Sequence, residues 1–503
     1  MMRPPHHPLL QQEGARRGGP VRALIASIAV TSTLGLAGCK AGPDYVRPEV
    51  EAPAAYRETP VHWKVARPSD DLHRGKWWEA FGDPELNGLV EQVEFSNQDV
   101  RLAEARFRQA QAAITGARSA LFPTVEANAS IIRSRSPSGA LGGTTAGRIV
   151  TNRSASLEAS WEPDLWGRVR RGVEASEAGA QASAADIVSA RLSAQAQLAT
   201  SYFLIRVLDV QKNLLEDTAA AFEKTLQLTK NRYAAGVAGR VDVVQAETQL
   251  RSTQAQALDL GVQRAQLEHA IALLMGRAPA NFTVPPASLR ITVPDVPLGL
   301  PSELLERRSD IAAAERRVAA ANAQIGVAQS AFFPSLLLSA TLGSRASDPS
   351  VWFTTASRFW SIGPAIAQTI FDAGLRRSQS DQAIAAYDAT VAEYRQTVLV
   401  GFREVEDQLA ALRILEEEAK VQDEAVRAAR ESVTLTNNQY RAGTVSFLNV
   451  AVVQAAQLNN ERTAVGLLGQ RLAAGVALIR ALGGGWDASS LPSAEQVRQG
   501  KKE

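Results

Sequence analysis

Four segments of the chain alternate between apolar and polar residues, which is the period expected of half-buried β-strands. Each is about as long as the roughly 9–11 residues that a transmembrane strand needs. Their polar positions carry Glu, Asn and Ser, as a water-filled lumen requires. Alternation alone fits any half-buried strand, but length and polarity together favour strands between lipid and water. The segments are Thr124–Ile132, Asn152–Trp161, Ser335–Gly343 and, less regularly, Ser361–Phe371.

Aromatic residues cluster where these predicted strands end, in two groups that suggest the two interfaces of a membrane. The group toward the helical segments is Phe122, Trp161, Trp166, Phe332, Phe333 and Phe371, and the group toward the loops is Trp352, Phe353, Phe359 and Trp360. Four strands cannot close a barrel, and hydrocarbon does not tolerate an open sheet edge because its backbone groups find no water there. The chain must therefore share a barrel with copies of itself, although this argument does not fix their number.

Long stretches without proline keep a helical period and predict two antiparallel helix pairs. The first helix spans roughly 100 Å at 1.5 Å per residue. A filament or scaffold would also contain such helices, but the return of each helix and the strands within each half favour a duct that crosses the periplasm from a membrane barrel. The helices are Arg168–Ala235 and Val241–Met275, joined at Gly236, and Gly374–Ala442 and onward to Leu482, joined at Gly443.

The chain also contains an internal duplication with a period of just over 200 residues. Matching residues hold a constant offset over some fifty positions, which chance does not produce. We interpret them as two copies of one structural half: a helix, two strands, a very long helix, a turn and a long helix. The second copies of Leu228, Asn231, Tyr233, Gly236, Val243 and Gly276 are Leu435, Asn438, Tyr440, Gly443, Val450 and Gly483.

The N-terminus reads as a secretory signal, with three arginines before an apolar run from Ala23 to Leu36. A run of about 14 apolar residues is short of the roughly 20 that a membrane-spanning helix needs. Its end, Leu36-Ala37-Gly38-Cys39, resembles the lipobox of bacterial lipoproteins, which implies cleavage before Cys39 and lipid attachment to it. Lys40 stands where an Asp would retain the lipoprotein at the inner membrane, so we expect the outer membrane.

Composition offers no support for an enzyme or a nucleic-acid partner. The net charge is +2, 21% of residues are charged, and no basic block stands out. One cysteine excludes an intramolecular disulfide and a cysteine-based metal site, and the five histidines are dispersed. The sequence has no Gly-rich phosphate loop, HExxH helix or nucleophile elbow. We therefore expect no catalysis, no metal and no cofactor.

Three motifs carry a family resemblance: Gly42-Pro43-Asp44-Tyr45, Trp77-Trp78 with Phe81-Gly82-Asp83-Pro84, and Leu304–Ile311 with its double arginine. With them, the chain resembles the outer membrane factors, the TolC-like channels, and in particular their NodT/OprM-type lipoprotein branch. The resemblance implies a TolC-like α/β-barrel: a homotrimer whose twelve strands close one outer-membrane β-barrel, continued by a long periplasmic α-helical barrel. The implied partners are a periplasmic adaptor (membrane fusion protein) and an inner-membrane pump, commonly of the resistance–nodulation–division (RND) class.

The resemblance also suggests how the chain is divided. The predicted parts are a signal peptide (1–38), an N-terminal equatorial segment (39–83), the first repeat (84–276), an equatorial linker (277–300), the second repeat (301–483) and a C-terminal equatorial segment (484–503).

The family closes the periplasmic end of its tube just after the second-half turn, and the matching positions here are Leu448, Asn449 and Val452. None is acidic, so an acidic ring would have to come from Asp242, the first-half counterpart of Asn449, while Leu448 would form an apolar constriction. These residues could instead merely pack neighbouring helices. The two turns, which are the distal points of the tube, should dock the adaptor; their residues include Tyr233, Gly236, Arg240, Tyr440, Gly443 and Phe447. Ser309 stands where the family has proline.

Three functions are consistent with these patterns. The first is a duct for small-molecule efflux, and the second is a duct of the same architecture for type I protein secretion. The lipobox and the lipoprotein-branch motifs favour the first. A periplasmic scaffold or adhesin is a third, but it would not need amphipathic strands with aromatic belts.

Overall fold

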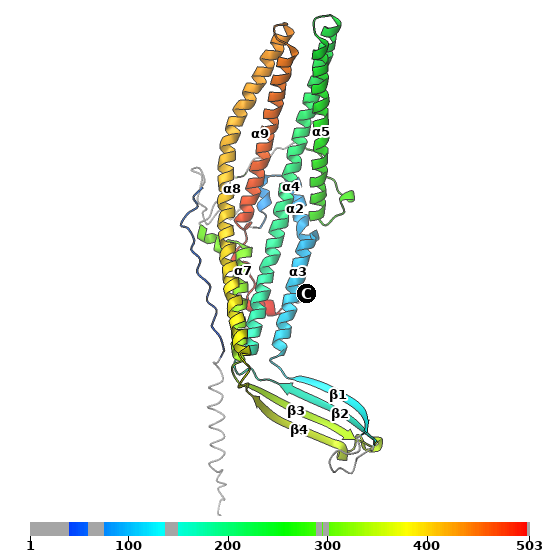
Figure 1. Ribbon diagram of the computed structural model, residues 1–503, viewed down its shortest axis with the longest axis vertical. Helices are drawn as coiled ribbons and strands as arrows, with labels where there is room; N and C mark the ends of the chain where they lie inside the picture. The colour runs from blue at the N-terminus through cyan, green and yellow to red at the C-terminus, as the bar shows by residue number, and fades with distance from the viewer. Residues whose placement is uncertain (1–39, 59–74, 136–148, 288–293, 295–300, 500–503) are drawn as a thin grey trace, which may run out of the picture. The chain divides into compact units, whose positions relative to one another are not determined.

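The computed structural model describes residues 40–58, 75–135, 149–287, 294 and 301–499. These residues form two compact units, one built mainly of strands and one of helices (Figure 1). Of the described residues, the strand unit takes 40–43, 120–135, 149–171 and 326–377, and the helical unit takes the remainder. Each unit therefore draws on both halves of the duplicated sequence.

The strand unit contains a four-stranded antiparallel sheet in the order β1-β2-β3-β4. The strands are β1 (Thr124–Arg135), β2 (Ile149–Trp161), β3 (Ser335–Ala346) and β4 (Arg358–Ala367). The four predicted strands are present, but the last ends at Ala367 and not at Phe371. Ala367 pairs with Ser335, the first residue of β3. Pro334 precedes it and has no N–H, so β4 has no partner that would extend the ladder.

The register gives the sheet one apolar and one polar face, because directly paired residues point to the same side. Two successive rows across β2, β3 and β4 are Leu157–Leu342–Trp360 and Glu158–Thr341–Ser361. The apolar face is uncovered within the unit, where Trp360 and Ile366 are each 74% exposed. A large apolar surface of this kind marks a membrane or protein contact.

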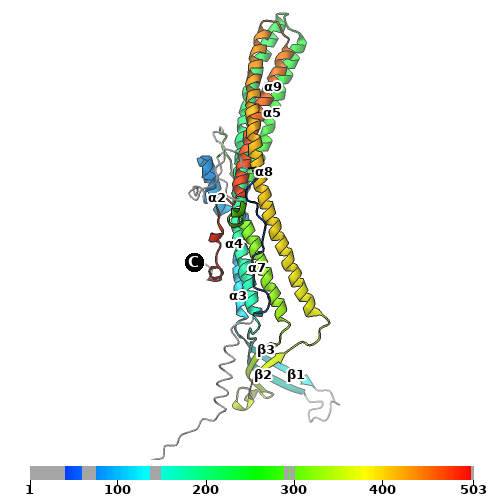
Figure 2. The same cartoon turned by 90° about the vertical axis from the view of Figure 1, so that its left-hand side faces the viewer.

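Four long helices dominate the helical unit (Figures 1 and 2). They are α4 (Arg168–Ala234), α5 (Arg240–Leu274), α8 (Leu375–Arg441) and α9 (Phe447–Ala481). Both α4 and α8 have 67 residues, and both α5 and α9 have 35. The second pair starts 207 residues after the first, at Leu375 against Arg168 and at Phe447 against Arg240. The two halves of the chain therefore form the same helical hairpin twice.

Shorter helices precede the sheet strands in each half. They are α2 (Pro84–Ser96) and α3 (Gln98–Ser119) in the first half, and α6 (Leu304–Arg307) and α7 (Ser309–Ser330) in the second. A further short helix, α10 (Ala494–Gln499), lies near the C-terminus. The sequence suggested a single helix before β1, but Asn97 interrupts it. The Asn97 Oδ1 accepts the N–H groups of Asp99 and Val100 at 2.9 and 3.0 Å, which caps α3. The Ser-Asn-Gln-Asp run around it was a usable capping signal.

The glycine that follows each helical hairpin lies very close to the backbone at the junction of the two short helices in the same half. A Cβ at Gly276 would lie 2.2 Å from the Ser96 carbonyl oxygen, and one at Gly483 would lie 1.9 Å from that of Arg307. Both glycines also have a positive φ, of 63° and 91°. Only glycine meets both conditions, which explains why this residue recurs at the same place in the two halves.

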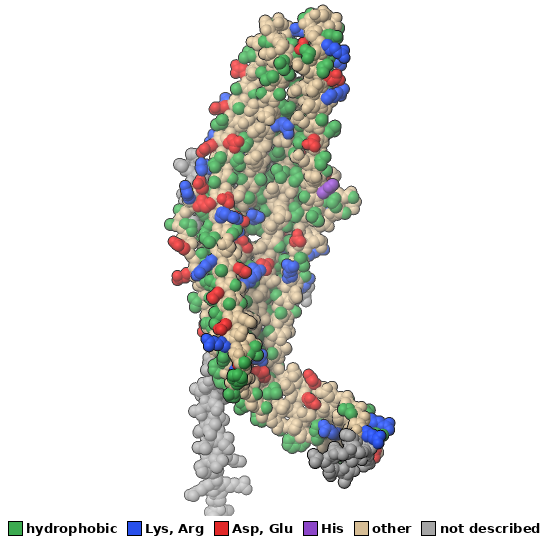
Figure 3. Space-filling model, viewed as in Figure 1, with side chains coloured by type: hydrophobic (Ala, Val, Ile, Leu, Met, Phe, Trp, Pro, Cys, Tyr) green, Lys and Arg blue, Asp and Glu red, His purple; other side chains and the backbone are tan. Residues whose placement is uncertain are grey.

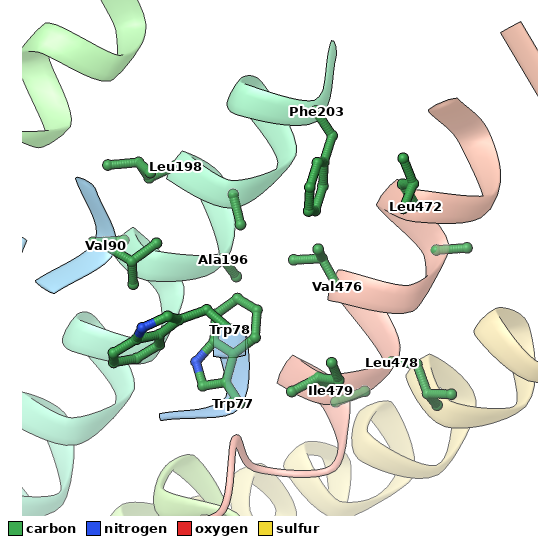
Figure 4. Close-up of a cluster of buried hydrophobic side chains, with 14 of the residues drawn as sticks. Trp77, Trp78, Val90, Ala196, Leu198, Phe203, Leu472, Val476, Leu478 and Ile479 are labelled. Atoms are coloured by element: carbon green, nitrogen blue, oxygen red, sulfur yellow. The ribbon is translucent and has the colours of Figure 1, made fainter. Parts of the chain in front are cut away.

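The main core of the helical unit lies near the middle of α4 and α8, where α5 and α9 end, and Figure 4 shows part of it. Trp77 and Trp78, from the second family motif, are 2% and 3% exposed, with ring centroids 5.8 Å apart. Phe81 contacts Phe203 of α4 at 4.8 Å. Most other side chains of this core are small or aliphatic, and the motif adds three aromatic rings to the five that the rest of the chain supplies. Those five are Tyr56, Tyr202, Phe203, Tyr394 and Phe402.

Among the described helices, α9 is the one whose length and composition would suit a membrane span, with a mean hydropathy of 1.3 over its best window. Half of that window is buried inside the protein. Gly469, Leu472, Val476 and Leu478 of α9 belong to its buried face. Packing within the helical unit accounts for the apolar character of this helix.

Candidate duct, helical tips and gate

The turns at the ends of the two hairpins have the same backbone geometry. Gly236 and Gly443 have φ values of 73° and 78°, as a left-handed helix end requires. Each donates its N–H to the residue three before it, Tyr233 at 2.9 Å and Tyr440 at 3.0 Å. The sequence-based expectation of glycine at a positive φ therefore matches both turns.

The side chains of the two tips differ, although their backbones match. Tyr440 and Phe447 are 4% and 1% exposed and contact each other edge to face at 5.9 Å. They belong to a cluster with Phe222 of the first hairpin, so they cannot present a surface to an adaptor in this conformation. Tyr233, the repeat counterpart of Tyr440, is 45% exposed, and Arg240 is also exposed.

Arg232 connects the two hairpins at this level. Its guanidinium lies 4.6 Å from the centroid of the Tyr440 ring, and its Nη1 donates to the Tyr440 carbonyl at 2.9 Å. The Tyr440 hydroxyl lies 3.3 Å from the Thr229 hydroxyl. We missed Arg232 from the sequence. A comparison of the repeats would have identified it, because Gln439 stands at the equivalent position.

Leu448 and Val452 lie one turn apart on α9 and are 54% and 59% exposed. Between them, Val450 is fully buried, so the two apolar side chains project from the opposite face of the helix. Asn449 is exposed and accepts a hydrogen bond from the Ser446 hydroxyl at 2.8 Å. Leu448 and Val452 are thus free to meet other copies of themselves, or a neighbouring helix.

Asp242 has a local structural role as well. Its Oδ2 accepts the N–H of Gly239 at 3.2 Å at the start of α5. This bond is one half of a capping box, since glycine has no side chain to make the other half. Within the described residues, Asp242 makes no ion pair with Arg240. The other carboxylate oxygen remains available, so capping and a contribution of charge at the gate are compatible.

The two outer helices of the hairpin layer carry uncovered apolar stripes. Along α8, one face shows an apolar residue at every seventh position, and α5 shows a second stripe with the alternating spacing of a coiled-coil seam. In the upper half of Figure 1 these helices lie at opposite edges. The apolar members are Ile414, Val421, Ala428 and Leu435 on α8, and Val241, Val244, Ala255, Leu258 and Val262 on α5. On α5 the two seam positions between Val244 and Ala255 are polar, Thr248 and Arg251.

These stripes repeat a contact that already exists inside the chain. A Cβ at Gly469 of α9 would lie 2.8 Å from a methyl group of Val207 of α4, so the two halves touch there. The residues 207 positions away are Ile414 and Val262, which are 50% and 57% exposed. Inside the chain, α4 of the first half contacts α9 of the second half. The equivalent surfaces of α8 and α5 have no such partner among the described residues and lie exposed at the two edges of the helical unit.

The other family motifs hold the middle of the helical unit together. Asp83 caps α2 through the Glu85 N–H at 2.9 Å and accepts the Tyr202 hydroxyl at 2.7 Å. Burial, and then the hydrogen bond to Asp83, raise the pKa of Tyr202 far above its usual value, so it remains a donor. The Tyr45 hydroxyl donates to Glu315.

Arg308, from the double-arginine motif, is 7% exposed and bonds Asp310, Glu404 and the Ala481 carbonyl. Burial alone would lower its pKa, but Asp310 and then Glu404 more than offset this and raise the pKa above its usual value. Arg308 therefore stays charged. It occupies the place that Asn97 has in the first half, where Asn97 Nδ2 donates to the Leu274 carbonyl at 2.8 Å.

A sheet with one lipid-compatible face, joined in one chain to two 67-residue helices, defines a membrane channel with a helical duct. A family model described as outer membrane efflux protein matches residues 89–277 and 300–484. The chain belongs to this family.

Related proteins are similar along most of their length. The chain is 32% identical over 464 residues to the probable efflux pump outer membrane protein TtgC of Pseudomonas putida, covering 92% of this chain and 96% of the relative. It is 33% identical to the pyoverdine export outer membrane protein OpmQ of Pseudomonas aeruginosa, covering 91% and 96%. The solved structure of the outer-membrane channel OprN matches with a TM-score of 0.82 at 33% identity, covering 89% of this chain and 100% of that one.

These comparisons confirm the TolC-like fold, the outer-membrane location and the efflux-channel function predicted from the sequence. The signal peptide and the lipid attachment site at Cys39 lie outside the described residues. The roles assigned to the gate and to the adaptor-docking turns stay predictions.

Proposed function

We propose that this chain is the exit duct of a tripartite efflux pump, in which three copies share one twelve-stranded barrel and one helical tube. The observation that carries this proposal is the uncovered repeat surface on α5 and α8. Ile414 and Val262 would meet between copies as Val207 and Gly469 meet within one. The sheet supports the same arrangement, because β1 and β4 each lack a second neighbour among the described strands.

The duct would receive its cargo from an inner-membrane RND-type pump through a periplasmic adaptor, and it would be anchored by lipid at Cys39. The exposed side chains of Tyr233 and Arg240 and the glycine turns at the tips suit adaptor docking, with Tyr440 and Phe447 supporting them from inside. The channel itself would conduct passively and catalyse nothing.

We expect the cargo to be small organic molecules. The names of the relatives support this choice over type I protein secretion, because they include a toluene efflux pump, a solvent efflux pump and a pyoverdine exporter. These named cargoes differ in chemistry, as we expect of a duct that discriminates weakly among small molecules.

The test is restoration of efflux in a Gram-negative strain that lacks its own outer-membrane efflux channels, with the matching adaptor and pump co-expressed. The chain should restore tolerance to toluene or a dye, whereas restored secretion of a protein without restored tolerance would favour the secretion duct. Gly236→Val and Gly443→Val should impair export without preventing outer-membrane insertion. Gly116→Val is the matched control, because Gly116 is helical and a Cβ there meets nothing within 4 Å. Normal export by both tip variants would refute docking at the turns.

A further inference from the structure

Four arginines lie on the apolar face of the sheet, all toward one end. This loop end of the sheet is formed by Arg135, Ile149, Ala346 and Arg358. Arg153 pairs with Ile131, Arg133 with Thr151, and Arg135 with Ile149, so these arginines share the face of Ile131. Arg358 pairs with Ser344, which pairs in turn with Ala155 of the same face. The rest of this face is apolar apart from Thr151 and Ser344.

Carboxylates balance only part of these charges, through the electrostatic interaction of Asp348 with Arg153. Between Glu126 and Glu158 the sequence contains Arg133, Arg135, Arg148 and Arg153 and no acid. In the described structure, the side chains of Arg133, Arg135 and Arg358 make no hydrogen bond or ion pair, and the Arg153 side chain donates to the Ser347 carbonyl at 2.8 Å. The nearby acid, Asp348, bonds the Ser350 N–H and hydroxyl at 2.9 and 2.8 Å. Figure 3 shows basic side chains gathered at this end of the strand unit.

The mutual repulsion of these arginines destabilises the sheet unless a bound anion neutralises their charges. Arg133 and Arg153 are diagonal neighbours on adjacent strands, a spacing of about 7–8 Å at which like charges repel. An arginine on a lipid-facing strand is tolerated near an interface, where the guanidinium reaches out of the hydrocarbon. The stacked rings of Trp352 and Phe353, 4.8 Å apart in the β3–β4 turn, mark that interface level.

We propose that Arg133, Arg135, Arg153 and Arg358 bind the phosphate groups of a phosphorylated lipid in the outer leaflet around the barrel. A planar guanidinium bonds two phosphate oxygens at once, and two diagonal arginines can share one phosphate. The apolar side chains below the arginines on the same face, such as Ile131 and Leu157, would contact the acyl chains. This inference goes beyond efflux and depends on the apolar face of the sheet meeting lipid.

Arg345 provides the matched control, because it lies at the same end on the other face. It pairs with Ser154, a residue of the polar face, and its guanidinium lies 5.1 Å from the Phe359 ring. Replacing it removes the same charge without touching the lipid-facing arginines.

The experiment measures lipid binding to the full, detergent-purified and delipidated channel by native mass spectrometry. The probes are lipid A with two phosphates, the same lipid A after dephosphorylation, and inorganic phosphate alone. The channel and Arg345→Gln should bind phosphorylated lipid A equally. Affinity should fall about fivefold for each arginine replaced, and therefore by about 25-fold in Arg133→Gln/Arg153→Gln.

Intact assembly of each variant, judged by its native mass and strand content, separates lost binding from lost folding. If the double variant does not assemble, Arg133→Lys/Arg153→Lys replaces it. This variant should weaken lipid A binding less than about 25-fold, because lysine keeps the charge but lacks the guanidinium that bonds two phosphate oxygens at once. Equal affinity for dephosphorylated lipid A, unchanged binding in an assembled variant, or binding of free phosphate as tight as that of the lipid would each overturn the proposal.

Discussion

Replacing Arg232 by alanine should loosen the two hairpin tips from each other and open the periplasmic end of the duct more often. The side chain makes two interactions across the hairpins, a hydrogen bond of 2.9 Å to the Tyr440 carbonyl and a contact of 4.6 Å to its ring. A hydrogen bond from a charged donor contributes about 1.5–3 kcal/mol, and a partly exposed cation–π contact about 0.5–1 kcal/mol. Solvent at the tip reduces both, so we take about 2 kcal/mol.

A change of about 2 kcal/mol corresponds to about a 30-fold shift in the equilibrium between clasped and released tips of each copy. Purified channel in planar lipid bilayers, without adaptor or pump, should then show more frequent openings and a higher basal conductance. The basal conductance of Arg232→Lys should lie between those of the unmodified channel and Arg232→Ala. Lysine keeps the positive charge but lacks the planar guanidinium that bonds the carbonyl and stacks on the ring.

Arg427→Ala is the matched control. Arg427 is an exposed arginine of α8 that pairs with Glu424 of the same helix at 3.8 Å, and its counterpart in the first half, Ala220, is also exposed. Its loss therefore removes an equal charge without touching the contact between hairpins. If Arg232→Ala and Arg427→Ala conduct alike, at the level of the unmodified channel, the clasp between the tips does not hold the duct closed.

Three further predictions concern assembly, gating and the anchor. Gly276→Ala and Gly483→Ala should prevent stable assembly, measured by native mass, because each Cβ would lie about 2 Å from a backbone oxygen; normal assembly would contradict this close approach. Leu448→Ala should raise basal conductance and Asp242→Ala should lower cation preference in bilayers; no change in either places the gate elsewhere. Cys39→Ser should abolish lipidation, seen by mass spectrometry of the mature N-terminus, and still allow the barrel to insert; an unmodified Cys39 in the natural protein would refute the anchor.

The sequence predicted the long helices to within one or two residues, because glycines flank them at matching places in both halves. The break at Asn97 and the early end of β4 were not predicted. The first is a capping effect within an otherwise continuous helical period, and the second depends on where Pro334 ends the partner strand.

The burial of the tip residues depends on tertiary partners that a local motif does not contain. Tyr233 and Tyr440 occupy equivalent positions in the two repeats, yet one is 45% and the other 4% exposed. The difference arises because Phe222, Leu226 and Arg232 of the first hairpin cover Tyr440, whereas no further hairpin among the described residues covers Tyr233. Adaptor docking at the turns stays a prediction, and the exposed side chain of Tyr233 suits it better than the buried side chain of Tyr440.

The most direct test of the proposed duct is cysteine cross-linking across the repeat surface. With Ile414→Cys and Val262→Cys in one chain, a short thiol cross-linker should join neighbouring copies into covalent dimers and trimers, seen on a denaturing gel of membranes. Val207→Cys/Gly469→Cys is the control, since the Val207 Cβ lies 3.6 Å from a Cβ built at Gly469, within disulfide range. It should link within one chain and leave the mass of a monomer. Monomers alone from the first pair, alongside an efficient internal link in the control, would contradict a shared duct built on the repeated contact.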